Sequence, residues 1–321
     1  MICSDKQTVL ALSGGVGGAK LALGLSKILA PQQLTIVANT ADDFEHLGLR
    51  ISPDLDTVMY TLAGRNNREQ GWGLAEESWQ AMEMLRTYQA PTWFQLGDRD
   101  IATHLVRRQM LAQGKTLSEV TEYLCRQLGV VHPLLPMSND AVRTWVATAD
   151  GDLPFQDYFV RERCQPAVRG FRFEGIENAR PQPRFMALLA DPQLSAILIC
   201  PSNPFVSIDP ILELAGIRAA MGNNSAPVIA VSPIVAGAAI KGPTAKMMAE
   251  ARIPISALGV AEHYGDLLDG FVIDAADADQ AREIERLGIA VHATQTVMHS
   301  LQDRILLARS TLEFASRLKG C

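Results

Sequence analysis

Short apolar runs alternate with amphipathic stretches at both ends of the chain. The apolar runs at 8–13 and 34–39 predict the first two buried strands, and the last helix is predicted over 296–318. Further strands are predicted at 196–200, 228–232, 255–258, 271–273 and 289–292. Strands that alternate with helices are typical of a parallel sheet with crossover helices. The pattern therefore predicts an α/β fold, Rossmann-like and doubly wound, with a mainly parallel sheet and helices on both of its faces.

The middle of the chain follows a different pattern. Residues 144–160 alternate polar and apolar positions around the turn Asp150-Gly151-Asp152, which predicts a hairpin. Helices are predicted at 55–63, 74–89, 100–113 and 118–128. We therefore predict a Rossmann-like nucleotide-binding core formed by 1–61 and 191–321. Residues 62–190 are predicted to form a mostly helical insertion subdomain.

Composition narrows the class of protein. The chain has 321 residues and a net charge of −6, with no basic run, which argues against a nucleic-acid partner. The longest nearly apolar run, 226–240, is too short and too interrupted to span a bilayer, so no membrane partner is expected. No signal peptide is apparent, and five scattered cysteines lack metal-ligand spacing. We expect free thiols and a cytoplasmic location.

A glycine-rich loop is the most informative motif. Segment 13–20 reads SGGVGGAK, directly after the first strand and at the start of a helix. Glycines let the backbone approach a ligand closely, and the first N–H groups of a helix attract anions. We expect Gly14, Gly15, Gly17, Gly18 and Lys20 to bind phosphate. The alternative is a tight strand–helix turn without ligand, but four glycines exceed what a turn needs.

This loop differs from two common nucleotide motifs. Segment 18–20, GAK, lacks the Gly-Lys-Ser/Thr of a P-loop. The second strand ends at Asn39, where an NAD site would place an acidic residue. An NAD-dependent oxidoreductase is therefore disfavoured.

Carboxylates follow the second strand closely. Asp42 and Asp43 come directly after it, and Asp54 and Asp56 follow within the next loop and helix start. Loops after parallel strands meet at the ligand crevice, near the predicted phosphate seat. Oxygen ligands of this kind suit Mg²⁺. We therefore predict Asp42, Asp43 and Asp56 as metal ligands and catalytic residues, whereas Asp54 is explained by a favourable place at a helix N-terminus.

Three further segments carry polar groups next to predicted turns. Segment 95–100, QLGDRD, is either a site or a salt-bridged helix start. A predicted strand is followed by Ser202, Asn203 and Pro204. At this edge of the sheet they are expected either to bind a base or phosphate or only to cap a helix. Lysines at the two ends of segment 241–246, KGPTAK, suggest a second anion seat. The predicted phosphate ligands thus also include Ser202, Asn203, Pro204, Lys241 and Lys246.

These motifs together resemble the 2-phospho-L-lactate transferase family (CofD, or LPPG:FO transferase) of coenzyme F420 biosynthesis. The motifs run in order over nearly the whole chain, and it is the ordered set that is specific. The matching segments are 13–20, 39–43, 51–57, 96–104, 135–140, 155–157, 168–170, 201–204, 231–233 and 259–262.

The resemblance implies a reaction and its partners. The family transfers a phosphorylated three-carbon acid (phospholactyl, phosphoenolpyruvyl or 3-phosphoglyceryl) from a guanosine diphosphate-linked donor to the ribityl hydroxyl of the deazaflavin FO, and GMP leaves. The resemblance also implies that the enzyme depends on Mg²⁺, that it forms a homodimer, and that the guanosine nucleotide lies along 201–204. By position, Asp56 and Gln95 would contact the deazaflavin, although relatives can carry lysine where Gln95 stands.

The acceptor site can also be sought in the residues themselves. A flat deazaflavin needs an apolar slot with a few polar groups. Trp72, Trp79, Trp93 and Phe94 lie close in sequence to Gln95 and Asp98, so we expect these two polar residues to bind the ring. The alternative is that the aromatic residues only pack the insertion's own helices, above all for Trp79. The six histidines show no ligand spacing, and we expect them to be structural.

A second family of another class shares part of the pattern. Gluconeogenesis-factor (YvcK-like) proteins share the glycine loop and segment 201–204, and they bind a nucleotide sugar as regulators. Segments 96–100 and 52–56 favour the transferase.

Overall fold

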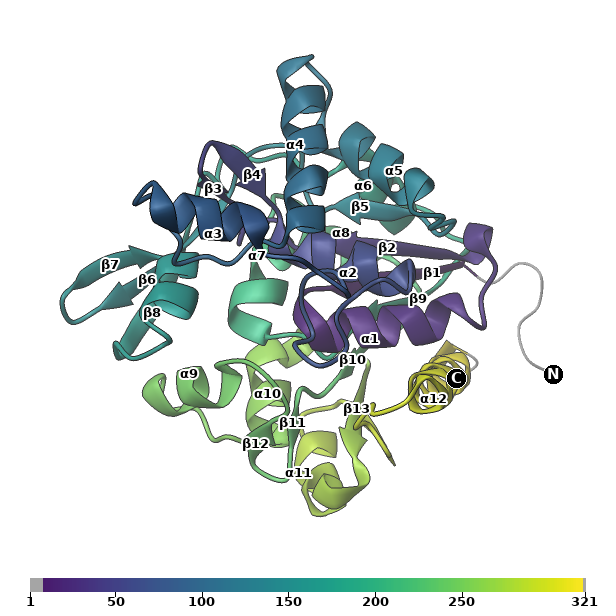
Figure 1. Cartoon of the computed structure of the whole chain (residues 1–321). Helices are drawn as coiled ribbons and strands as arrows, with labels where there is room; N and C mark the ends of the chain where they lie inside the picture. The colour runs from purple at the N-terminus through teal and green to yellow at the C-terminus, as the bar shows by residue number, and fades with distance from the viewer. Residues whose placement is uncertain (1–7, 320–321) are drawn as a thin grey trace.

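Seven parallel strands form the central sheet of the computed structural model, which describes residues 8–319 (Figure 1). The order across the sheet is β14-β13-β10-β9-β1-β2-β5. The predicted Rossmann-like doubly wound fold is confirmed. The strands are β1 (Thr8–Ser13), β2 (Leu34–Ala38), β5 (Leu134–Pro136), β9 (Leu194–Ile199), β10 (Val228–Val231), β13 (Gly270–Asp274) and β14 (Ala290–Thr294).

Helices cover both faces of this sheet because alternate side chains of each strand point to opposite sides. Val9 and Ala11 of β1 belong to one apolar cluster, and Leu10 and Leu12 belong to the other. The first cluster includes α1 (Gly15–Ser26), α2 (Pro53–Leu62), α5 (Leu117–Gln127) and α12 (Leu301–Lys319). The second includes α6 (Pro183–Leu189), α7 (Asp209–Leu212), α8 (Ile217–Asn223), α9 (Thr244–Glu250), α10 (Ala257–Tyr264) and α11 (Ala281–Glu285).

The range predicted as an insertion contributes one strand to the central sheet. β5 lies at its edge and pairs with β2. The rest of the range holds α3 (Gln80–Thr87), α4 (Asp98–Ala112) and an antiparallel sheet of β6 (Arg143–Thr148), β7 (Gly151–Pro154) and β8 (Val168–Glu174), seen at the left of Figure 1. The predicted hairpin is thus present, whereas the division into core and insertion stays a prediction. Two short antiparallel pairs are β3 (Phe44–His46) with β4 (Leu49–Ile51) and β11 (Ile234–Val235) with β12 (Ala238–Ala239).

Besides the last helix, which was predicted over 296–318 and begins only at Leu301, two predicted elements differ from those observed. No strand forms at 255–258, because the Ser256 hydroxyl accepts the N–H of Gly259 at 3.0 Å and starts α10 there. The helix predicted over 74–89 begins only at Gln80, where the Asp98 carboxylate accepts the first helical N–H groups. Both differences come from capping by a side chain rather than from the apolar pattern.

The state of the cysteines and the apolar character of the helices can be compared with the expectations from composition. Cys125, Cys164 and Cys200 are free thiols, and Cys3 and Cys321 lie outside the described residues. Within residues 8–319, none of the helices is both long enough and apolar enough to cross a bilayer.

Candidate active site

A cavity of about 550 Å³ opens at the carboxyl edge of the sheet, beside the central strands β1 and β9 where the strand order reverses. Connections that follow several strands contribute to its wall. Of the predicted site residues, the cavity is lined by Gly14, Gly15, Gly17, Lys20, Asp42, Asp56, Gln95, Ser202, Asn203 and Lys241. The predicted residues outside this lining are Gly18, Asp43, Asp98, Pro204 and Lys246.

The glycine loop is fixed between β1 and the segment after β9. The Ser202 hydroxyl accepts the N–H of Gly14 at 3.0 Å and donates to its carbonyl at 2.8 Å. Gly15 has a φ of 62°, and a Cβ on Gly17 would collide with the carbonyl oxygen of Pro201. Side chains are therefore excluded where the loop turns and where it meets the neighbouring segment. The N-terminus of α1 meets the cavity with no acidic side chain in its first turn, and the N–H groups that follow Gly15, whose own N–H binds Asp54, can attract an anion.

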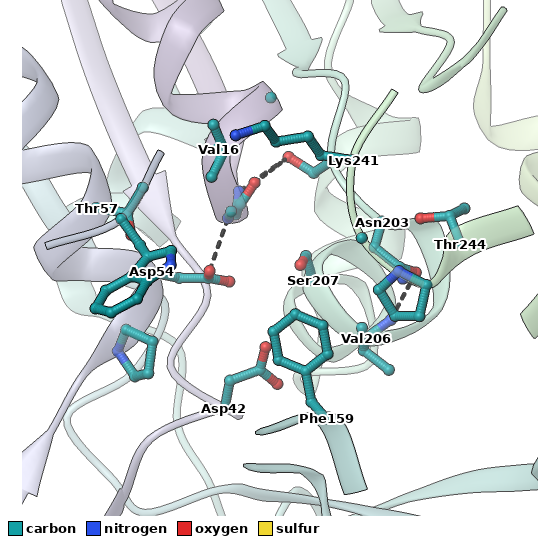
Figure 2. A pocket seen from close by; sticks show the side chains of 18 of the residues that line it. Val16, Asp42, Asp54, Thr57, Phe159, Asn203, Val206, Ser207, Lys241 and Thr244 are labelled. Carbon is teal, nitrogen blue, oxygen red and sulfur yellow. Dashed lines mark hydrogen bonds between the residues drawn. The ribbon is translucent and has the colours of Figure 1, made fainter. Parts of the chain in front are cut away.

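Two lysines reach the same end of the cavity. Lys20, on α1, donates to the carbonyl of Met298 at 3.0 Å, and Lys241 donates to the carbonyl of Gln70 at 3.2 Å. Figure 2 shows Lys241 next to Val16 at the start of α1. Burial, together with the charges of Arg304 and Lys241, lowers the pKa of Lys20. Neither lysine forms an ion pair with another residue of the described chain, so both charges remain for an anionic ligand.

Two buried carboxylates face the cavity beside this seat (Figure 2). Asp54 accepts the N–H of Gly15 at 2.7 Å and the amide of Asn39 at 3.1 Å, and Asp42 accepts the hydroxyl of Thr144 at 3.2 Å. Burial raises the pKa of Asp54 to about 6. Burial, and then the charge of Asp54, raises the pKa of Asp42. Neither carboxylate has a positively charged side-chain partner within residues 8–319, so this donor pair fits a divalent cation shared with phosphates.

The other two carboxylates of the predicted metal set are already paired. Asp43 forms an ion pair with Arg50 at 3.0 Å and accepts the hydroxyl of Ser52 at 2.8 Å. Asp56 forms a buried ion pair with Arg107. Among the described residues, no group of three or more His, Cys, Asp or Glu is arranged to hold a metal ion. The structure therefore does not bring the three predicted ligands together. It instead pairs Asp42 with Asp54, which sequence reasoning had assigned only to the helix dipole.

Aromatic side chains form a further part of the cavity wall, where Phe159 lies next to Asp42 (Figure 2). Phe155 and Phe159 stack with ring centroids 5.5 Å apart, and both line the cavity. Phe94 and Trp72 also line it. Trp93 lies outside the lining and packs edge-on against Phe94. Sequence reasoning missed the two stacked phenylalanines, although the matching segment 155–157 pointed to this part of the chain.

The two polar residues predicted to bind the deazaflavin lie in different places. Gln95 lines the cavity, and its amide donates to the carbonyl of Thr92 at 2.7 Å. Asp98 lies outside the lining and accepts the hydroxyl of Ser78 at 2.7 Å and the N–H groups at the start of α3. These hydrogen bonds lower the pKa of Asp98. Asp98 therefore caps α3 in this structure.

The segment after β9 is held by its own side chains. The Asn203 oxygen accepts the N–H of Phe205 at 3.0 Å, and its amide nitrogen lies 3.3 Å from the sulfur of Met247. Lys246 forms an ion pair with Glu250 at 2.5 Å and donates to the carbonyl of Pro166 at 2.9 Å, outside the cavity lining. Hence Asn203 shapes the turn that borders the cavity, whereas Lys246 is occupied elsewhere.

Comparison with known proteins identifies the family. The family model of 2-phospho-L-lactate transferase CofD matches residues 9–304. The chain belongs to the CofD family. Its recognition as a transferase of this family, expected from the ordered motifs, is confirmed.

Several CofD-family relatives match over almost their entire length. A phosphoenolpyruvate transferase from Streptomyces griseus is 41% identical over 318 residues, which cover 97% of this chain and 99% of the relative. A 2-phospho-L-lactate transferase from Methanosarcina mazei is 38% identical over 305 residues, covering 95% and 99%. A crystal structure of a UPF0052-family protein from Bacillus halodurans has a TM-score of 0.64 at 14% identity and covers 97% of this chain and 100% of that chain, which shows the shared fold.

Three cavity residues of this CofD-family chain, to which sequence reasoning assigned no role, form a buried polar group with Asp56. Tyr60, Asp100 and His104 line the cavity together with Asp56. All four are at most 8% exposed. The spacing of Asp100 and His104, four residues apart on α4, places them on one helix face and was the available signal.

Proposed function

We propose that this CofD-family transferase moves a phosphorylated three-carbon acid from a guanosine diphosphate-linked donor to the ribityl hydroxyl of the deazaflavin FO and releases GMP. One observation carries the proposal: a single cavity joins an anion seat with two unpaired lysines to an aromatic slot. The proposal names a class of transferred acid rather than a single acid. Relatives named for phosphoenolpyruvate and for 2-phospho-L-lactate both match nearly the whole chain.

The donor's phosphates would bind at the N-terminus of α1. Backbone N–H groups of the glycine loop, Lys20 and Lys241 supply positive charge there. The nucleotide would lie along 201–204, where Ser202 and Asn203 hold the turn. Their side chains already have partners in the protein, so the backbone of this turn and the cavity wall would make the contacts.

Magnesium would bind Asp42 and Asp54 in this proposal, with donor phosphates as the remaining ligands. Asp43 and Asp56, predicted earlier as ligands, already accept hydrogen bonds from arginines. When bound, Mg²⁺ offsets the negative charge on the phosphoryl oxygens. Two buried carboxylates without a cationic partner are costly, and the ion would relieve that cost.

The acceptor ring would occupy the aromatic slot between Phe94 and the stacked pair Phe155 and Phe159. The ribityl chain would then point towards Asp56, which lies on α2 two residues after Asp54. The hydroxyl oxygen attacks the phosphorus that bears the acid, and the bond between that phosphorus and the oxygen of GMP breaks. Positioning of the substrates, Mg²⁺ and the lysines would together carry most of the catalysis, without a covalent nucleophile.

Two further parts of the proposal concern the assembly and its location. We propose a homodimer, as the family resemblance implies, and a cytoplasmic location, which free thiols at three described cysteines support. Light scattering at several concentrations measures the first, and fractionation of cells that produce the protein measures the second.

Mass spectrometry of the product tests the proposed reaction directly. The enzyme is incubated with FO, GTP, Mg²⁺, a partner guanylyltransferase and each of the three acids in turn. We expect FO to gain the mass of one phosphorylated acid, with GMP formed in equal amount. Thermal unfolding distinguishes the regulator class: at one hundred times the dissociation constant a ligand adds about 2.7 kcal/mol. Stabilisation by a UDP-sugar but not by guanine nucleotides would contradict the transferase.

A further inference from the structure

A chain of buried polar side chains lies behind the acceptor end of the cavity. It runs from Asp56 through Arg107, His104 and Asp100 to Tyr60. We propose that Arg107 is a positioning residue for the acceptor: it holds the Asp56 carboxylate in the orientation that binds the ribityl hydroxyls. This inference rests on the proposed function and extends it to a residue that does not touch the substrate.

The contact between Arg107 and Asp56 uses both carboxylate oxygens. One guanidinium nitrogen donates to one oxygen at 3.0 Å, and the second nitrogen donates to the other oxygen at shorter range. This fork geometry fixes a carboxylate in direction as well as in charge. Each carboxylate oxygen keeps a further lone pair, so Asp56 can still accept hydrogen bonds from a ligand in the cavity.

His104 orients the arginine from the other side. Its Nδ1 lies 3.0 Å from a nitrogen of Arg107, and its Nε2 lies 3.3 Å from a carboxylate oxygen of Asp100. Arginine has only donors, so Nδ1 must be the acceptor and Nε2 must carry the ring proton. Nδ1 is thereby used inside the protein, whereas the buried Nε2 contacts Asp100 without a hydrogen bond of good geometry. Because its Nδ1 lone pair faces Arg107, His104 is not placed to take the hydroxyl proton.

Asp100 ends the chain and is fixed by one hydrogen bond that it accepts and one that it donates. It accepts the hydroxyl of Tyr60 at 2.7 Å, and its backbone N–H donates to Glu77 at 2.9 Å. The close contact with His104 and the hydrogen bond from Tyr60, together with nearby positive charge, lower the pKa of Asp100 despite its burial. The hydrogen bonds of the chain run from Tyr60 to Asp100 and from Arg107 to His104 and Asp56.

The place of this chain favours a role in binding over a role in stability alone. A buried ion pair contributes little net stability compared with apolar side chains of similar size. Four members line the cavity, whereas Arg107 does not and is 2% exposed. A purely structural role would not require these polar side chains to line a ligand cavity. Arg107 is placed to act on the ligand only through Asp56.

A double-mutant cycle tests the inference. FO fluorescence is titrated with wild type, Arg107→Met, Asp56→Asn and the double variant, and GDP affinity is measured in parallel. We expect Arg107→Met to raise the FO dissociation constant about tenfold in the wild-type background and less than twofold in the Asp56→Asn background. The GDP dissociation constant is expected to change less than twofold in all four proteins.

Two controls keep the result interpretable. Arg107→Lys keeps the buried charge but loses the fork, so it replaces the methionine variant if that protein does not fold, with the same expected weakening of FO binding. His263→Gln breaks a partly buried ion pair with Asp209, outside the cavity lining, and is expected to leave FO affinity unchanged.

The outcomes separate this inference from the proposed function. Equal weakening of FO binding by Arg107→Met in both backgrounds, or unchanged FO binding, would overturn the positioning role while the transferase proposal stands. Absence of FO binding to the wild-type protein would instead overturn the proposed acceptor and the inference that rests on it.

Discussion

Two groups of charged residues in the cavity wall differ in whether they form ion pairs within the protein. At the anion end, Lys20, Lys241, Asp42 and Asp54 have no ion-pair partner within residues 8–319. At the acceptor end, Asp56 is paired with Arg107. The two unpaired carboxylates are buried and are costly without a cation, whereas paired charges hold a fixed geometry. In the proposed function, the unpaired group binds ions and phosphates, and the paired group orients a neutral acceptor.

The largest effect is expected at Asp42. Asp42→Asn removes one of the two unpaired carboxylates and keeps a side chain that can bond with Thr144. We expect the transfer rate at saturating Mg²⁺ to fall about 100-fold or more, since charge stabilisation by a bound metal would be lost. Stability should not fall, because a buried unpaired charge is removed.

Steady-state kinetics and thermal unfolding measure both parts of this prediction. Asp98→Asn is the control, because Asp98 is a half-buried carboxylate outside the cavity lining. A transfer rate for Asp42→Asn within threefold of the control would show that the two unpaired carboxylates do not serve catalysis.

Two glycines at the anion end are expected to respond differently to alanine. Gly17→Ala places a Cβ against the carbonyl of Pro201, which we expect to cost about 1–3 kcal/mol and to weaken GDP binding. Gly15→Ala meets open space and only the strain of a positive φ, about 1 kcal/mol. Chemical denaturation and GDP titration of the two variants measure the difference. Equal loss in both would mean that contact with the segment after β9 is unimportant.

The free energy of unfolding is expected to depend on pH because the unpaired carboxylate of Asp54 has a raised pKa. Burial raises the pKa of Asp54 to about 6 in the folded protein. Its protonated form therefore contributes stability that is present below about pH 3.9 and is lost as the pH rises through about 6. Relative to Asp54→Asn, wild type should lose roughly 1–3 kcal/mol across this window.

Urea unfolding between about pH 4 and about pH 7.5 measures this loss. Mg²⁺ at the upper end of the range should stabilise wild type and not Asp54→Asn. Parallel pH profiles for the two proteins would contradict the assignment of Asp54.

The smallest effect is expected at Asp98. Asp98→Ala removes the cap of α3 and should lower the melting temperature slightly, without a change in FO affinity. Gln95→Ala, by contrast, changes the cavity wall and should weaken FO binding. Fluorescence titration of both variants makes the comparison, and a weaker FO affinity for Asp98→Ala would return Asp98 to the acceptor site.

The contrast between these two groups of residues also explains which parts of the site could be predicted from the sequence. The glycine loop was found because its residues are contiguous and its physics is local, at one strand–helix connection. The acceptor end comes from α2, α4 and the segments around Phe94 and Phe155, which only the fold brings together. The ion pair could not be predicted for the same reason: Asp56 and Arg107 are 51 residues apart, so nothing local showed that Asp56 is paired and Asp54 is not.

Element prediction failed where side chains cap the backbone. The apolar pattern predicted the central strands well, because buried parallel strands form continuous apolar runs. It missed β5, a strand of three residues that is too short to show a pattern. It also missed the true start of α3, which depends on Asp98, a residue far along the chain.

The unpaired carboxylates and the paired Asp56 should act separately, on the nucleotide and on the acceptor. FO affinity and the Mg²⁺-dependent affinity for GDP are measured for Asp42→Asn and for Asp56→Asn. We expect Asp42→Asn to lose the effect of Mg²⁺ on GDP binding and to keep FO affinity, whereas Asp56→Asn should weaken FO binding and keep the effect of Mg²⁺. Loss of both properties in both variants would contradict this separation.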